Sequence, residues 1–215
     1  MRDKDQLLIL GATGDIGGEL CKSLSREFSV LGLASRETPE LKGSGFDYKV
    51  IGHISDGNEA DLDFLADEGV DCVINAAGTR ITGSELVSNE ILYKSFESNL
   101  LLLSNFFDII KGFINKGGMF INIGSIASFA SSDEEWEYAF VKASADIWMR
   151  KQQLKYQGKI KFTNLRLGAV KSRMTADRAN AARHISTEDL ATLLVGIIES
   201  RRSIDVPVID LFRGK

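Results

Sequence analysis

The sequence predicts an α/β fold: one doubly wound parallel sheet of about seven strands with helices on both faces. Three observations lead to this prediction. Short runs of strand length alternate with helical patterns along the chain, and these runs are almost continuously apolar, as in strands buried on both faces. The first run leads directly into a glycine-rich turn. With two prolines in 215 residues and no linker or repeat, residues 1–215 are expected to form a single domain.

Expected strands and helices alternate in chain order. The expected strands are residues 6–10, 29–34, 46–51, 71–75, 119–123, 161–167 and 206–211. The expected helices are residues 19–28, 61–67, 90–111 and 187–199, together with a helix that carries Tyr138 and ends near Tyr156. Ser186 and Thr187 are N-cap candidates for the last helix. Gly117 and Gly118 are expected to turn the chain into its fifth strand, and residues 171–184 to form a polar loop or lid.

Charge and cysteine usage limit the partners and the compartment. The net charge of −4 and the isoelectric point near 5.3 argue against nucleic acid or an anionic membrane as the main partner. The longest apolar stretch, residues 100–107, is too short to span a bilayer, and the charged residues 1–5 do not resemble a secretory signal. Cys21 and Cys72 lack the spacing of metal ligands, so we expect reduced core thiols in a cytoplasmic protein and no metal site.

The turn after the first expected strand has the composition of a phosphate-binding loop. Its glycines permit a tight turn, and the N–H groups at the start of the following helix can stabilise a pyrophosphate. A glycine turn that only packs a helix on a strand is the alternative. The cofactor-binding residues predicted here are Gly11, Thr13, Gly14, Asp15, Ile16 and Gly17.

The second expected strand ends at Ser35 and Arg36, where dinucleotide-binding folds select their cofactor. An acidic residue there binds the 2′-hydroxyl of NAD, whereas an arginine accommodates the 2′-phosphate of NADP. Ser35 and Arg36 therefore favour NADP(H), with NAD(H) as the alternative if Arg36 is only a solvated loop residue. At the end of the fourth strand, Asn75 and the small residues Ala76, Ala77 and Gly78 are further predicted cofactor-binding residues, because small residues let the chain pass close to a ligand.

Tyr138 and Lys142 form a candidate proton-transfer pair. Residues four apart lie on the same face of a helix, one turn from each other. A free tyrosine has a pKa near ~10, and a neighbouring cation favours the phenolate, which makes such a pair suitable for general acid–base catalysis. A Tyr-x-x-x-Lys pattern also arises by chance, so its meaning depends on whether the chain supplies a cofactor site in the right order.

The motifs taken together resemble the short-chain dehydrogenase/reductase family over nearly the whole chain. The resemblance is carried by the order and spacing of Gly11-x-x-Gly14-x-x-Gly17, Asn75-Ala76-Ala77-Gly78, Asn99, Ser125 and Tyr138-x-x-x-Lys142. It implies a Rossmann fold, a nicotinamide cofactor, a small-molecule substrate, and a catalytic tetrad of Asn99, Ser125, Tyr138 and Lys142.

The same resemblance implies a division of roles. Tyr138 would protonate the alkoxide formed as hydride reaches a carbonyl carbon, while Ser125 would hydrogen-bond the same oxygen. Lys142 would hold the nicotinamide ribose, and Asn99 would hold a water that links Lys142 to solvent. The residues expected to touch the nicotinamide end are Gly168, Val170 and Ser172.

Assembly is also implied by the resemblance. The apolar face from Leu92 to Ile110, together with Phe140, Ile147 and Trp148, matches the two helices that the family pairs into a four-helix interface. We expect a homodimer, with a homotetramer as the alternative.

Several positions depart from the family pattern. Leu167-Gly168 replaces the usual Pro-Gly, His53 replaces an Asp near the adenine pocket, and Gly124 stands where many relatives have a second serine. The glycine spacing is that of the extended branch, so a sugar- or nucleotide-sugar-modifying member is one alternative function. A non-catalytic NAD(P)-sensing protein is another.

Five basic residues raise the question of an anionic substrate. They follow the fourth strand or lie after the sixth, where ligands bind in such sheets: Arg80, Lys171, Arg173, Arg178 and Arg183. They could bind a carboxylate or phosphate, although solvated surface charges are the interpretation that we favour.

Overall fold

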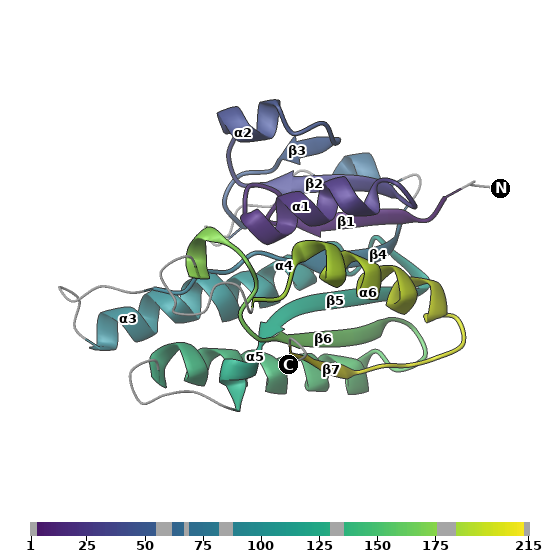
Figure 1. Cartoon of the computed structure of the whole chain (residues 1–215). Coiled ribbons are helices and arrows are strands. Elements are labelled where there is room, and N and C mark those ends of the chain that lie inside the picture. The colour runs from purple at the N-terminus through teal and green to yellow at the C-terminus, as the bar shows by residue number, and fades with distance from the viewer. Residues whose placement is uncertain are drawn as a thin grey trace.

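The computed structural model describes residues 4–54, 62–66, 69–81, 88–129, 136–175 and 184–212. Within these residues, seven strands form one parallel sheet in the order β3-β2-β1-β4-β5-β6-β7 (Figure 1). The strands are β1 (Gln6–Leu10), β2 (Ser29–Ala34), β3 (Tyr48–Val50), β4 (Val70–Asn75), β5 (Ile114–Ser125), β6 (Lys161–Leu167) and β7 (Val208–Leu211). The predicted fold class, a parallel sheet between layers of helices, is confirmed.

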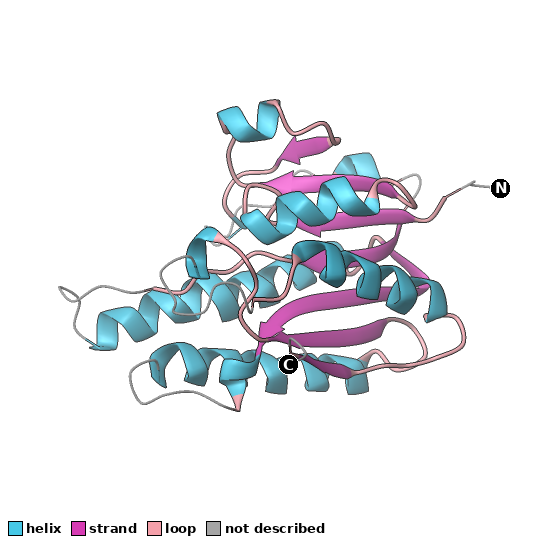
Figure 2. Ribbon diagram, in the orientation of Figure 1, coloured by secondary structure: helices cyan, strands magenta, loops and turns pink. Residues whose placement is uncertain are grey.

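The helices alternate with the strands along the chain and lie on both faces of the sheet, where Figure 2 shows them in cyan. They are α1 (Asp15–Leu24), α2 (Pro39–Lys42), α3 (Ser88–Ser95), α4 (Leu102–Ile110), α5 (Trp136–Lys155) and α6 (Thr187–Ser200). A π-helical segment, Phe96–Leu101, joins α3 to α4. Single 3₁₀ turns lie at Asp63–Leu65, Ile126–Ser128 and Arg173–Thr175.

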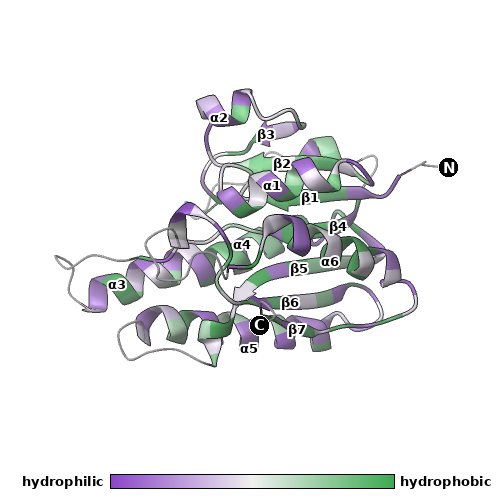
Figure 3. Ribbon diagram, in the orientation of Figure 1, coloured by the Kyte–Doolittle hydropathy of each residue, from purple (hydrophilic) through white to green (hydrophobic). Residues whose placement is uncertain are grey.

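The core has one layer on each face of the sheet, and the strands between the layers are largely hydrophobic (Figure 3). On one face, α1 and α6 bury aliphatic side chains against the strands. On the other, α4 and α5 cover an aromatic cluster in which Phe107 makes edge contacts to Phe120 and Phe162. Because the helices bury both faces, the chemistry is left to the strand ends.

The strand order positions a crevice. The chain leaves β1 toward β2 and later returns to place β4 on the other side of β1, so the connections after β1 and β4 run in opposite directions. Ligands in open parallel sheets bind outside the carboxyl ends of the strands at this kind of switch point. In this chain, the glycine loop and the Asn75–Gly78 segment meet there.

The amino ends of the strands hold a different polar cluster. Arg201 is buried and pairs with Asp5, with 2.8 Å between Nη1 and Oδ2. Asp71 accepts hydrogen bonds from the backbone N–H of Gln6 and from the side-chain amide of Asn115, each at 3.0 Å. These contacts tie the start of β1 to β4, β5 and the end of α6.

Several element boundaries differ from the predictions. Helix α1 begins at Asp15, not residue 19, because Gly14 already has the extended backbone of an N-cap. Strand β5 starts at Ile114 and runs through Gly117, whose φ of 80° accompanies a register shift against β4, so the two glycines do not precede the strand. The expected helix at 61–67 is one 3₁₀ turn within the described residues, and α2 was not predicted.

Both cysteines are buried, as expected. Burial raises the pKa of the Cys21 thiol to about 12 and raises the pKa of the Cys72 thiol as well. Among the described helices, none combines the length and apolar character needed to cross a membrane.

Candidate active site

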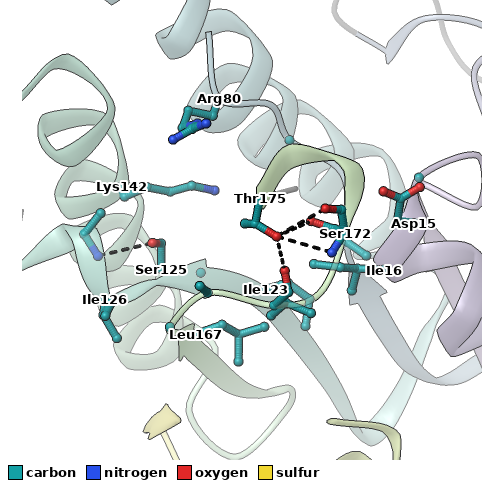
Figure 4. Close-up of a pocket in the computed structure, with 18 of the residues that line it drawn as sticks. Asp15, Ile16, Arg80, Ile123, Ser125, Ile126, Lys142, Leu167, Ser172 and Thr175 are labelled. Carbon is teal, nitrogen blue, oxygen red and sulfur yellow. Dashed lines mark hydrogen bonds between the residues drawn. The ribbon is translucent and has the colours of Figure 1, made fainter. Parts of the chain in front are cut away.

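A cavity of about 320 Å³ opens at the carboxyl ends of the central strands (Figure 4). Its walls come from the start of α1, the segment after β4, the end of β5, the first turns of α5 and the segment after β6. Twelve predicted site residues line it: Gly14, Asp15, Ile16, Ala76, Ala77, Gly78, Ser125, Tyr138, Lys142, Gly168, Val170 and Ser172. The fold therefore gathers residues from five separate segments around one space.

The glycine loop is packed too tightly for side chains. A Cβ on Gly11, whose φ is 94°, would lie 2.8 Å from the backbone nitrogen of Ala77. A Cβ on Gly17 would lie 2.2 Å from the carbonyl oxygen of Gly11. Gly14 caps α1, so the first N–H groups of the helix have no intrahelical acceptor and face the loop. This close approach of backbone to backbone, beside open N–H donors, fits a bound dinucleotide phosphate.

Asp15 and Arg173 join the two sides of this site. The Asp15 carboxylate accepts hydrogen bonds from the backbone N–H of Arg173 at 2.5 Å and from its side-chain Nε at 2.6 Å. A carboxylate in the first turn of α1 is also favoured by the helix dipole. The contact ties the segment after β6 to the glycine loop across 158 residues of chain.

Tyr138 and Lys142 lie one turn apart on α5, as predicted, and the Lys142 ammonium lies 5.4 Å from the centre of the Tyr138 ring. Lys142 is buried. Ser125 ends β5, and its Oγ accepts a hydrogen bond from the backbone N–H of Ala127 at 3.2 Å. Figure 4 shows Ser125 and Lys142 on the same side of the cavity, so helix α5 and strand β5 present their reactive groups to one space.

Asn99 lies behind the cavity wall, in the π-helical segment between α3 and α4. Its buried amide nitrogen donates to the carbonyl oxygens of Thr79 at 2.8 Å and Ser95 at 2.9 Å, while its Oδ1 has no hydrogen-bond partner. A Cβ on Gly78 would lie 2.7 Å from that oxygen and 3.6 Å from the Lys142 ammonium. Gly78, with a φ of 146°, thus leaves the space of a side chain free beside an open acceptor and a cation.

Other predicted residues lie outside the cavity. Thr13 borders the neighbouring depression beside α1 and α2, and Gly11 and Gly17 form the tight turn beneath the cavity. Ser35 and Arg36 follow the end of β2, where Arg36 is exposed, and His53 is exposed as well. Asn75 is buried below the cavity floor.

The basic residues are divided between several places. Arg80 lines the cavity on the side of Lys142, and Lys171 borders the depression beside α1. Arg178 and Arg183 lie outside the described residues. Among the described residues, no group of three His, Cys, Asp or Glu side chains is placed to hold a metal ion.

Sequence reasoning missed much of the apolar wall and one polar anchor. The wall residues are Ile123, Ile126 and Leu167. Thr175 is the anchor, since its hydroxyl donates to the carbonyl oxygen of Val170 at 2.5 Å and holds the turn that carries Ser172. Apolar residues that end a strand give no signal of their own, because strand interiors have the same composition.

Comparison with known proteins assigns the family. The profile described as "NAD dependent epimerase/dehydratase family" matches residues 7–202. The chain belongs to this family. No curated protein sequence matches it. The match spans the glycine loop, the cavity and α6, so the family assignment covers the whole candidate site.

Solved structures that are similar to this chain show the same fold at low sequence identity. An alcohol dehydrogenase from the archaeon Thermococcus sibiricus, complexed with 5-hydroxy-NADP, has a TM-score of 0.80 at 20% identity, covering 97% of this chain and 96% of that one. A 3-oxoacyl-[acyl-carrier protein] reductase from Brucella melitensis with NAD has a TM-score of 0.81 at 18% identity, covering 100% and 98%. A short chain dehydrogenase from Burkholderia cenocepacia in complex with NADP has a TM-score of 0.81 at 19% sequence identity, covering 98% of this chain and 97% of that one. The predicted resemblance to short-chain dehydrogenases/reductases is confirmed.

Proposed function

We propose that this chain is an NAD(P)-dependent oxidoreductase of the short-chain dehydrogenase/reductase type that interconverts a carbonyl compound and a secondary alcohol. One observation carries the proposal: Ser125, Tyr138 and Lys142 line a single cavity that also borders the glycine loop. The family assignment and the nicotinamide nucleotides named with the three structural neighbours support it. In this proposal residues 1–215 act as one dinucleotide-binding and catalytic domain.

The chain offers a separate place for each half of a dinucleotide. The N–H groups at the start of α1 would bind the pyrophosphate, and Arg36 at the end of β2 would favour the 2′-phosphate of NADP(H) over NAD(H). Lys142, Val170 and Ser172 would hold the nicotinamide half, which supplies or accepts the hydride. The nicotinamide half is thus assigned to the cavity, and the 2′-phosphate end to the surface at the end of β2, outside the cavity.

The chain's own residues would handle the proton. The Tyr138 hydroxyl would donate to the developing alkoxide, and the Ser125 hydroxyl would hydrogen-bond the same oxygen. The Lys142 ammonium would stabilise the resulting phenolate by its charge. The unpaired Oδ1 of Asn99 faces the same corner and would accept from a water that returns the proton to Lys142.

The test replaces Tyr138 by Phe. Turnover of a ketone panel with NADPH and with NADH should fall at least ~100-fold, because the general acid is lost. Nucleotide binding, measured by calorimetry, should stay near that of the unmodified protein. Tyr156→Phe serves as the matched control, since Tyr156 lies against Phe107 in the aromatic cluster. Undiminished turnover by Tyr138→Phe would refute the assignment, and a nucleotide sugar in the substrate panel tests the alternative chemistry.

Cofactor choice is tested at Arg36. Arg36→Ala should lower the affinity for NADPH about tenfold through loss of the phosphate contact and leave the affinity for NADH unchanged. Equal effects on both nucleotides would remove Arg36 as the selector.

We also propose a homodimer formed along α5. Phe140, Ile147 and Leu154 are seven residues apart, so they lie on one face of the helix, and each is more than half exposed. Trp148, expected on this surface, packs against Phe107 instead, with ring centres 5.6 Å apart. Light scattering should give twice the 23.6 kDa chain mass at micromolar concentration, and Ile147→Glu should give the monomer. A monomer without the substitution would contradict the proposal.

A further inference from the structure

Three buried asparagines form a ladder across the centre of the sheet. Asn75 on β4, Asn122 on β5 and Asn164 on β6 are register partners on neighbouring strands. The amide nitrogen of Asn75 donates to Oδ1 of Asn122 at 2.9 Å, and that of Asn122 donates to Oδ1 of Asn164 at 2.8 Å. All three side chains are at least 97% buried. Their amides therefore point in one direction, from β4 toward β6.

The ladder ends on a carboxylate of α5. The amide nitrogen of Asn164 donates to Oδ1 of Asp146 at 2.5 Å. Hydrogen bonds that point toward a negative charge polarise and strengthen one another. Oδ2 of Asp146 lies 2.7 Å from Nε of Arg166, an ion pair in which the N–H does not point at the oxygen as a hydrogen bond requires. Arg166 also stacks on Phe129, 5.2 Å from its ring centre.

The other end of the ladder reaches the cavity. Oδ1 of Asn75 accepts a hydrogen bond from the backbone N–H of Ala77 at 3.3 Å, which shapes the turn leading to Gly78. Gly78 in turn lies against Asn99 and Lys142.

Lys142 is thus connected to Asp146 in two ways, along helix α5 and through the asparagine ladder. Asp146 lies one helical turn beyond Lys142 on α5, so a displacement of its carboxylate moves the helix that carries the ammonium. The ladder joins the same carboxylate to the turn against which the ammonium lies. The three amides of the ladder are therefore a continuous hydrogen-bonded link between α5 and the Asn75–Gly78 turn.

We propose that Asp146 is a positioning residue for the nicotinamide half of the cofactor site, acting on Lys142 and the Asn75–Gly78 turn through the asparagine ladder. The inference rests on the proposed function, because it assigns Lys142 to that half of the cofactor. Asp146 does not line the cavity and touches no ligand in this scheme.

The experiment compares a whole cofactor with its adenosine half. Asp146→Leu removes the acceptor while keeping the branched side chain of four heavy atoms. In calorimetry it should lower the affinity for NADPH about tenfold. The affinity for 2′,5′-ADP, which has no nicotinamide, should stay that of the unmodified protein. NADH and ADP form the equivalent pair. Asp146→Asn keeps one acceptor oxygen for Asn164 and should restore most of the NADPH affinity.

Asp71→Leu is the matched control, because Asp71 also accepts from an asparagine amide but lies at the amino ends of the strands. It should lower the melting temperature as Asp146→Leu does and leave both affinities unchanged. If Asp146→Leu does not fold, Asp146→Ser, too short to reach Asn164, carries the same expectation.

Two results separate the inference from the proposed function. Normal NADPH affinity in folded Asp146→Leu or Asp146→Ser, or an equal loss of affinity for NADPH and 2′,5′-ADP, would overturn the inference alone. Failure of the unmodified protein to bind either nicotinamide nucleotide would overturn the proposed function and this inference with it.

Discussion

The two ends of the parallel sheet use similar polar groups in different ways. At the amino ends, Asp71 and Asn115 are joined by a hydrogen bond, and Asp5 meets the buried Arg201. At the carboxyl ends, Asp146 and Asn164 are joined in the same manner, but there Asn99 keeps an open Oδ1 beside a cavity of about 320 Å³. Paired groups hold strands together, whereas a buried acceptor without a partner costs stability unless a water or ligand occupies it.

From this difference we expect substitutions at the carboxyl ends of the strands to affect activity and those at the amino ends to affect stability only. Both ends contain buried charge and glycines with no room for a Cβ, so burial alone does not mark the site. The carboxyl ends differ in combining an open acceptor, a buried cation and bare backbone around one space. Matched substitutions at the two ends should therefore separate turnover from stability.

The largest contrast is expected between the two buried cations. Lys142→Met should lower turnover at least ~100-fold, because it removes the charge proposed to stabilise the Tyr138 phenolate. Arg201→Met should leave turnover unchanged and lower the free energy of unfolding by about 2 kcal/mol, since Asp5 loses its close ion pair but is partly solvated and keeps the longer contact with Arg202 at 3.8 Å. Steady-state kinetics and urea unfolding measure the two effects. A loss of turnover in Arg201→Met would break the comparison.

A smaller contrast is expected between two glycines of β5. A Cβ on Gly118 would lie 2.8 Å from the carbonyl oxygen of Asn115, and one on Gly124 would lie 2.9 Å from Oδ1 of Asn164. Gly118→Ala and Gly124→Ala should each cost about 1–3 kcal/mol of unfolding free energy through overpacking.

Only Gly124→Ala should also lower the affinity for NADPH, because its Cβ displaces Asn164, a member of the asparagine ladder. Calorimetry with both variants checks this, and equal NADPH affinities in the two variants would contradict it.

The smallest effect concerns the buried thiol of Cys21. Its pKa is raised to about 12 in the folded state, so between pH 9 and that value the unfolded chain releases a proton that the folded chain retains. The free energy of unfolding should therefore fall as pH rises, by up to ~1.4 kcal/mol per pH unit for this thiol. Cys21→Ala should show a shallower decline in urea unfolding between pH 8 and 10. An unchanged slope would argue against a protonated thiol.

The elements that the sequence predicted well are those with local signals. The glycine loop follows β1 directly, and Tyr138 and Lys142 share a helix face by spacing alone. Strands β1, β2 and β6 have the predicted bounds because each is an uninterrupted apolar run between polar residues.

The remaining features depend on contacts between distant residues. Asp15 and Arg173 are 158 residues apart, and no motif around either residue predicts that they pair. The π-helical turn at Asn99 packs against α5, and no residue type within Phe96–Leu101 predicts it. The ladder did leave a signal, because Asn75, Asn122 and Asn164 are polar residues inside or at the end of apolar strands. A buried strand accepts such a residue only if its hydrogen bonds are satisfied.

The asparagine ladder also gives the protein built-in spectroscopic reporters. Side-chain amide protons that are buried and hydrogen-bonded exchange slowly with solvent, so those of Asn75, Asn122 and Asn164 should persist in deuterated buffer after surface amides have vanished from a nitrogen–proton correlation spectrum. These three side chains lie between the Asn75–Gly78 turn and α5, and those of Asn122 and Asn164 are not among the groups proposed to bind a ligand. Nucleotide titrations could thus be followed from inside the sheet, without a label and before any substrate is known.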